Sequence, residues 1–494
     1  MADDPLNLDE PGEWAGLWWL PEEPENKFPG VLRYLPNSRI ELSLIGAFEN
    51  RLMTHTSSGV VLVHSGSRTF DVIHGAAERR EITLFDCHAS NTSRSMGARV
   101  KTPDKQTLVA STALIGVHVS DEDEARFAAA EVSVEDLTLW ASSSIFEATL
   151  GMPDGVPDGS GTISVKPIDS QSVTVDGTQF VLAHLHTLPF FDHRRSGTTG
   201  RVRDTAFVRI VPAEALSFRT ALQSASLIQD LVALATHRAA GVIWLRLELV
   251  RDEQAPSDGR PLLRRKVDVL YSPPVSTERD ADAADPRRVF FTCESLPFEQ
   301  VVPRWVGAHQ RLQSATNMIM GLRYAPARYI ESNLLTAVGA AEVLHRRLSI
   351  DEAPMPTTEF KQMRAAMLEH VPEQHQDRFR GVIRNDPTLR DRLIALANRP
   401  DAEAISLLMP NLEHWAARTA RARNDLAHEG ETPRHSLEEL VVIVEVTTAV
   451  VILNLLHELG LSAERQRELV GEHPQLSTTA ERATELLAGP PAES

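Results

Sequence analysis

The spacing of hydrophobic and polar residues divides the chain into two regions. Up to about residue 275, short runs of β-forming residues are separated by Gly, Pro, Asn and Asp, as at 39–44, 81–85 and 242–247. Such runs are typical of β-strands joined by turns. From about residue 299 onward, apolar residues recur every three or four positions, which is typical of packed helices. The pattern predicts an α+β multidomain protein, with a β-rich N-terminal domain and an all-α helical bundle after it.

Helical periodicity is strongest in the C-terminal region. Helices are expected at residues 304–322, 327–348, 357–384, 388–398, 408–428, 436–459 and 463–472. Pro372 is expected to break the third of these, because proline cannot donate a backbone hydrogen bond inside a helix. In the N-terminal region one long helical pattern, 213–237, interrupts the predicted strands.

A change of composition separates the two regions. Pro273-Pro274 and an acidic run at 280–286 follow the last predicted strand, and such stretches are typical of linkers. We therefore expect an N-terminal domain at 1–275, a linker at 276–298 and a helical domain at 299–494.

One apolar run, 440–456, raises the question of a membrane span. Glu445 and Asn454 interrupt it, and it is shorter than the ~20 residues that a span requires. We interpret it as a buried helix. The N-terminus is acidic and lacks the apolar core of a secretory signal. The sequence predicts a cytoplasmic protein without a membrane anchor.

Composition narrows the function classes. The net charge of −18 argues against a general nucleic-acid coat protein but allows a local basic pocket. Cys87 and Cys293 are isolated, which indicates neither a disulfide framework nor a cysteine zinc site. His184 and His186, followed by Asp192-His193, leave a metal site as an alternative, although chance pairs are common among 18 histidines. We expect no metal and no cofactor.

The three tryptophans near the N-terminus lie in one predicted strand. We expect Trp14, Trp18 and Trp19 to pack against a β-sheet. The alternative hypothesis is that they stack on nucleic-acid bases.

The stretch Arg423-Asn424-Asp425-Leu426-Ala427-His428 carries the clearest chemistry in the chain. Arginine binds phosphate through a planar fork, and a neutral imidazole can remove a proton near pH 7. An Arg followed by a His after four to six residues is not informative by itself. Six such pairs occur in the chain, and chance predicts roughly five. Requiring Asn directly after Arg, and exactly four residues between Arg and His, lowers the chance expectation to about 0.04, and one match remains, Arg423-Asn424 with His428.

Helical geometry gives this segment two faces. At 100° per residue, one face carries His414, Arg421, Asn424 and His428, and the other carries Trp415, Thr419, Ala422 and Leu426. Two interpretations remain open from spacing alone: an RNA-directed site, or a solvated helix end where His428 interacts with the last carbonyls.

The six-residue motif inside a multi-helix domain resembles the active-site motif of HEPN-superfamily ribonucleases, and in particular the ApeA-like HEPN proteins of bacterial anti-phage defence. The N-terminal strand pattern that begins Gly12-Glu13-Trp14 is similar to the β-rich domain that precedes HEPN in that family. The resemblance implies a metal-independent endoribonuclease that leaves 2′,3′-cyclic phosphate ends. His428 would act as general base or acid, Arg423 would bind the scissile phosphate, and Asn424 would orient either group.

The resemblance also implies partners. HEPN domains usually pair, and because the chain has one motif, a composite site requires a homodimer or a higher homo-oligomer. The substrate would be RNA, with tRNA as one candidate, and a phage-derived trigger would act on the N-terminal domain. Glu342 could orient Arg423, because an acid in an apolar helix needs a partner. His414 and Arg421 could widen the pocket.

The sequence is compatible with three classes of function. The first is the defence ribonuclease. The second is a non-catalytic HEPN module that dimerises and holds RNA or protein, and the third is the toxin of a toxin–antitoxin pair. Substituting His428 separates the first class from the second.

Overall fold

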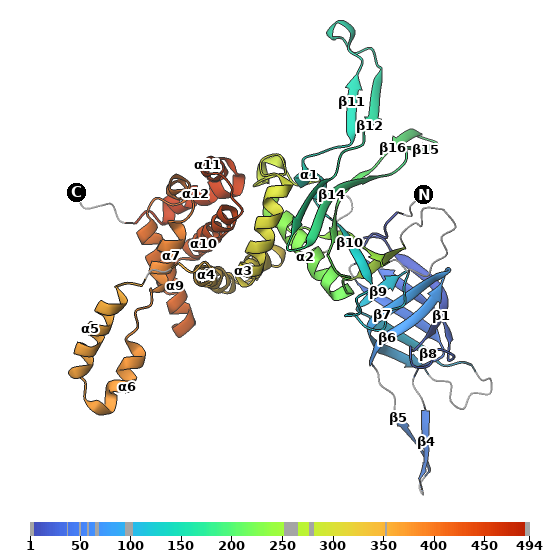
Figure 1. The fold of residues 1–494 in the computed structure, drawn as a ribbon, viewed down its shortest axis with the longest axis horizontal. Coiled ribbons are helices and arrows are strands. Elements are labelled where there is room, and N and C mark those ends of the chain that lie inside the picture. Colours follow the sequence, from blue (N-terminus) through green and yellow to red (C-terminus); the bar gives the residue numbers. More distant parts are fainter. Residues whose placement is uncertain are drawn as a thin grey trace. The chain divides into compact units, whose positions relative to one another are not determined.

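The computed structural model describes residues 4–36, 38–48, 51–56, 59–64, 69–93, 102–250, 265–275, 281–350 and 353–489. The chain forms two compact units (Figure 1). One comprises Met1–Ala284 with Phe291–Pro303, and the other comprises Asp285–Phe290 with Arg304–Ser494. The first is β-rich and the second is helical, so the predicted fold class is confirmed.

Part of the N-terminal unit is a closed barrel. Six antiparallel strands pair in the order β7-β6-β1-β2-β3-β8, and β8 pairs back to β7. The barrel strands are β1 (Gly12–Trp19), β2 (Phe28–Leu35), β3 (Arg39–Ile45), β6 (Thr69–Ala77), β7 (Arg80–Ser93) and β8 (Lys105–Ala110). Trp14, Trp18 and Trp19 are buried, which confirms that they pack the sheet. Gly75 makes room for this core, because a Cβ there would lie 2.3 Å from the Trp18 ring.

The barrel continues into an open antiparallel sheet. The first half of β7 pairs with β9, and the order then runs β9-β19-β18-β10-β17-β14-β13. The added strands are β9 (Thr112–Ile115), β10 (Phe127–Val134), β13 (Gln171–Val175), β14 (Thr178–His186), β17 (Asp204–Val211), β18 (Val242–Leu249) and β19 (Lys266–Tyr271). The predicted strands at 39–44, 81–85 and 242–247 lie within β3, β7 and β18.

Two helices and three hairpins complete this unit. Helix α2 (Phe218–Ala235) packs on β10, and α1 (Leu137–Ala141) packs on β17. The helix predicted at 213–237 begins only at Phe218, because Ser217 caps it by accepting the Thr220 N–H. The hairpins β4–β5 (Arg51–Thr56, Gly59–His64), β11–β12 (Phe146–Leu150, Gly161–Val165) and β15–β16 (Phe190–Arg194, Gly197–Arg201) form separate two-stranded sheets and extend outward in Figure 1.

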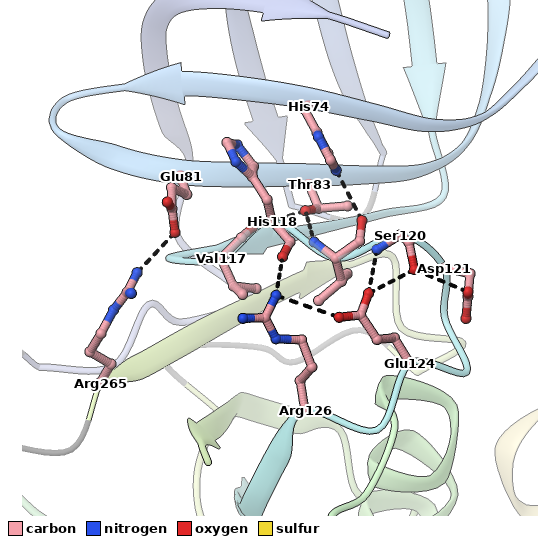
Figure 2. Close-up of polar contacts among 11 residues, drawn as sticks. His74, Glu81, Thr83, Val117, His118, Ser120, Asp121, Glu124, Arg126 and Arg265 are labelled. Carbon is pink, nitrogen blue, oxygen red and sulfur yellow. Dashed lines mark hydrogen bonds and ion pairs between the residues drawn. The ribbon is translucent and has the colours of Figure 1, made fainter. Parts of the chain in front are cut away.

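The segment between β9 and β10 is fastened to the barrel by polar contacts (Figure 2). His74 Nε2 donates to the Val119 carbonyl at 2.9 Å, and Thr83 Oγ1 donates to the Val117 carbonyl at 2.9 Å. Arg126 donates to the His118 carbonyl at 3.1 Å. The His74 and His118 rings stack at 4.4 Å. The contacts of His74 and Thr83 attach this segment to the barrel, and the bond from Arg126 braces the segment itself.

The C-terminal unit contains the predicted helical bundle. Its helices are α3 (Phe298–Tyr324, which begins in the first unit), α4 (Ile330–Arg347), α5 (Thr357–Glu369), α6 (Glu373–Val382), α7 (Leu389–Ala397), α8 (Ala402–Leu408), α9 (Leu412–Glu429), α10 (Leu437–Glu458), α11 (Ala463–Glu472) and α12 (Pro474–Leu486). The seven predicted helical segments are all present. The third is broken before Glu373, as expected for Pro372, and α8 and α12 were not predicted.

Helix α10 is the core helix of the bundle. Among the described residues it alone is long and apolar enough to cross a membrane, yet 72% of its most apolar window is buried within the chain. Its two polar interruptions are satisfied: Asn454 donates to the Leu396 and Val450 carbonyls, and Glu445 pairs with Arg482 at 2.8 Å. The interpretation as a buried helix is therefore confirmed.

The predicted linker is only partly described, since residues 276–280 lie outside the described ranges. Beyond them, Pro286–Arg288 form a short 3-10 helix, and Phe290, Phe291 and Leu296 are buried.

Candidate active site

Helix α9 presents the motif residues. Asn411 caps its start by accepting the His414 N–H, and Gly430 ends it in a left-handed conformation at φ 75°. Trp415, Ala416, Thr419 and Ala422 are buried, and α9 packs on α4, α7 and α10. The predicted apolar face is therefore turned into the bundle, and the opposite face is left at the surface.

Arg423 is held by a carboxylate from another helix. Its Nη2 lies 3.2 Å from Oε1 of Glu342, which is on α4. Two more guanidinium groups approach the other oxygen of Glu342, Arg392 of α7 at 3.7 Å and Arg346 at 3.8 Å. The Glu342 side chain is 15% exposed and that of Arg423 is 35% exposed. One largely buried carboxylate thus faces three arginines, which leaves a local surplus of positive charge.

Asn424 and His428 extend the site along the helix surface. Asn424 accepts a hydrogen bond from Arg423 Nη1 at 3.3 Å, and both Asn424 and His428 are exposed. Because residues four apart lie on the same helix face, His428 projects one turn beyond Asn424. Arg423 therefore contacts both Glu342 and Asn424, and His428 is exposed one helical turn beyond Asn424.

His414 lies away from Arg423 and Glu342, whereas Arg421 lies three residues before Asn424 on the same helix face. His414 lies fourteen residues before His428, about 21 Å along the helix axis, and a Cβ at Gly489 would lie 3.3 Å from its ring. Arg421 is exposed on another side of the helix from Arg423. Whether His414 and Arg421 widen the pocket stays a prediction.

Sequence reasoning did not identify three residues near Glu342. Arg392 and Arg346 share its carboxylate, and His345 lies buried next to them. Burial lowers the pKa of His345, and the charges of Arg392 and Arg346 lower it further. Arg346 could have been found from its i,i+4 spacing to Glu342. Arg392 carries no local signal, because its contact joins two separate helices.

A second polar cluster lies where α9 turns into α10. Arg418 pairs with Glu439, and His435 Nε2 donates to the Arg418 carbonyl at 3.2 Å. Burial lowers the pKa of His435, as does the charge of Arg418. Asp425 is half-buried, and its Oδ2 is buried without a hydrogen-bond partner. This cluster fixes the end of the helix that carries His428.

The alternative metal site gains no support. His184 Nδ1 lies 3.0 Å from Asp204, and its Nε2 lies 2.9 Å from the Ser143 hydroxyl. Across the part of the chain that the structure describes, no three His, Cys, Asp or Glu side chains are grouped to hold a metal ion.

Two protein-family models match parts of the chain. A family model for ApeA N-terminal domain 1 matches residues 13–305, and one for the Apea-like HEPN domain matches residues 335–465, which include the whole motif. No curated protein and no solved structure matches the chain. The fold and the site define a two-part protein, in which a β-rich region precedes a HEPN-type helical domain.

The chain belongs to the family of ApeA-like HEPN proteins, and the resemblance read from the sequence is confirmed. The family places it among HEPN-type defence proteins. HEPN domains typically dimerise and bind RNA.

Proposed function

We propose that the protein is a metal-independent endoribonuclease that acts in the cytoplasm during anti-phage, abortive-infection defence. The observation that carries this proposal is the Glu342–Arg423 pair at 3.2 Å. A guanidinium has five N–H donors, and the contacts to Glu342 and Asn424 leave donors for a phosphate. The partly exposed Arg423 is thus held in a fixed orientation at the surface, beside an exposed imidazole.

The proposed reaction is an internal transesterification. His428 removes the proton of a ribose 2′-hydroxyl, or protonates the leaving oxygen. The 2′-oxygen forms a bond to phosphorus, and the bond to the 5′-oxygen of the next nucleotide breaks. The products are a 2′,3′-cyclic phosphate and a 5′-hydroxyl. Arg423 neutralises the charge that develops on the phosphate, and Asn424 orients the phosphate or the imidazole.

We propose that the complete site forms between two chains. The chain carries one motif, and His428, Asn424 and part of Arg423 face solvent. Leu335, an exposed apolar side chain on α4, is seven residues before Glu342 and shares its side of the helix. A second HEPN domain placed against this surface would cover Leu335 and bring two motifs into one cleft.

The N-terminal unit is the proposed sensor. A cavity of about 610 Å³ is lined by both stacked histidines, by apolar residues and by acids such as Asp71 and Asp121. It lies beside the polar contacts of Figure 2 that join the barrel to the open sheet. A phage-derived trigger bound there would act on the junction between the two parts of this unit.

The catalytic assignment is tested by His428→Ala and Arg423→Ala. Each is expected to lower the rate of RNA cleavage by about 100-fold or more, because a positioned acid–base group contributes about 10²–10⁴-fold and a group that stabilises transition-state charge contributes about 10²–10³-fold. His375→Ala, an exposed histidine on α6, is the matched control and should keep the full rate. Mapping of the cleaved ends should find cyclic phosphate, and a chelator should leave the rate unchanged. Equal cleavage by wild type and His428→Ala would refute the assignment.

The competing functions give different outcomes. If His428→Ala and Arg423→Ala both preserve phage protection, the protein acts as a binding module. A toxin of a toxin–antitoxin pair would instead arrest growth without phage, and co-expression of a neighbouring gene product would relieve that arrest.

A further inference from the structure

The β15–β16 hairpin exposes two aromatic rings. Phe190 and Phe191 are 65% and 61% exposed, and Leu188 just before them is 67% exposed. Large aromatic side chains are among the residues most often buried on average. Two exposed rings next to each other in sequence, on a hairpin that extends from the sheet (Figure 1), make this hairpin a candidate contact site.

The register of the hairpin determines how each ring is presented. Phe191 lies opposite Gly200, and a Cβ at Gly200 would lie 3.2 Å from the Phe191 ring. The ring therefore rests on the partner strand where the glycine leaves room, and its outer surface stays open. Phe190 lies opposite Arg201 on the other face of the hairpin. Each face thus carries one ring.

The charge around the rings is strongly positive. Residues 187–203, here called the basic hairpin, contain Arg194, Arg195, Arg201 and Arg203 and a single acid, Asp192. The chain as a whole carries a net charge of −18. A basic segment in an acidic protein that also exposes aromatic rings is the pattern by which single-stranded nucleic acid is bound.

The β11–β12 hairpin also exposes large apolar side chains, but its charge has the opposite sign. Leu150 and Ile163 are even more exposed, at 76% and 74%. Between residues 146 and 166, however, that hairpin carries Glu147, Asp154 and Asp158 against one lysine. Its surplus of negative charge would repel phosphates, so the two hairpins differ in the partner that they can accept.

We propose that the basic hairpin is a binding site for single-stranded RNA. Phe190 and Phe191 stack on bases, and the arginines neutralise the phosphates on either side. The hairpin binds the RNA substrate in addition to the HEPN motif, so the inference rests on the proposed ribonuclease function. Because every base offers a flat face, this site tolerates many sequences.

Binding is tested separately from cleavage. The full chain carrying His428→Ala is titrated into a labelled 2′-O-methyl RNA strand, which cannot form a cyclic phosphate. Adding Phe190→Ala with Phe191→Ala is expected to weaken binding by about ten-fold or more. Arg194 pairs with Asp192 at 2.8 Å, so the charge test uses two other exposed arginines of the hairpin. Adding Arg195→Gln with Arg201→Gln is expected to reduce the slope of log K against log salt by about 1.4. Leu150→Ala with Ile163→Ala is the matched control and should bind like the parent.

The outcomes separate this inference from the proposed function. In the active chain, the hairpin variants should raise KM for long RNA and leave kcat unchanged. If they bind and cut RNA like their parents, the hairpin is not an RNA site. If they keep RNA binding but lose binding to anionic lipid vesicles, its partner is a membrane and the inference fails. Wild-type protein that binds through the hairpin but cuts no RNA would refute only the ribonuclease assignment.

Discussion

Glu342 is the residue on which the geometry of the candidate site depends. Its carboxylate is 15% exposed and lies between three guanidinium groups at 3.2–3.8 Å. A largely buried ion pair costs much of its attraction in desolvation, but removal of one partner leaves the others uncompensated. Here the loss of one acid would leave three like charges together.

Glu342→Gln tests this dependence. We expect the free energy of unfolding to fall by about 1–3 kcal/mol, below the range for fully buried pairs because Arg423 and Arg346 reach solvent. RNA cleavage should fall as well, since Arg423 loses its fixed orientation. Urea unfolding and initial cleavage rates measure the two effects.

Two further variants make this prediction specific. Glu359→Gln, an exposed acid on α5, should change stability by less than about 0.5 kcal/mol. Adding Arg392→Gln to Glu342→Gln should cost less than the sum of the single changes, because it removes one of the unpaired charges. If the two changes in unfolding free energy add exactly, Arg392 does not share the Glu342 carboxylate.

The sequence indicated part of this site. Glu342 stood out because an acid in an apolar helix needs a partner, and Arg423 stood out through the motif. Arg392 could not be found, because its contact with Glu342 spans fifty residues and depends on how α4 and α7 pack. Whether His428 and Asn424 act in catalysis stays a prediction.

At the scale of elements, local periodicity predicted the long helices and several strands. Helix α8 was missed because it has seven residues and follows its Asp401 cap within a short turn. Helix α12 was missed because Ser, Thr and Ala dominate its sequence and obscure its apolar stripe. Closure of the barrel through β8 joins β3 to a strand about sixty residues later. Alternation along a strand cannot specify such a partner.

The start of α12 predicts a pH-dependent stability. His473 Nδ1 accepts from the Gln475 and Leu476 N–H groups, and its Nε2 donates to the Arg288 carbonyl. Nδ1 can accept only while the ring is neutral. Burial lowers the pKa of His473, and the charges of Arg323 and Arg288 lower it further.

The direction of the effect follows from proton linkage. Below pH ~6.5 the unfolded histidine takes up a proton, whereas the folded one does so only at lower pH. Stability is therefore complete above pH ~6.5 and falls toward the folded pKa by at most about 1.4 kcal/mol per pH unit. His473→Asn keeps a capping side chain that does not titrate, so denaturant unfolding from pH 7 to pH 5 should show a shallower loss. An unchanged slope would assign the acid sensitivity to His345 or His435, whose pKa values are also lowered by burial.

At the scale of the whole molecule, the proposed activity depends on a second chain. In the proposed dimer, a single motif with its basic residues at the surface would provide one half of a cleft. Leu335 is 44% exposed and lies about 10 Å along α4 from Glu342. An apolar side chain beside an exposed, positively charged site is suited to an interface between two copies, because it loses solvent contact only when the second copy binds.

Leu335→Glu is expected to separate the two chains. A charge buried without a partner at an interface center weakens association, so sedimentation should shift from dimer toward monomer. Cleavage per chain should fall most at low protein concentration and recover as concentration rises, because mass action restores the dimer. Met367→Glu, at a residue on α5 that is 49% exposed, is the matched control and should leave both measurements unchanged. If wild-type cleavage stays strictly proportional to concentration while the protein sediments as a monomer, the site is complete in one chain.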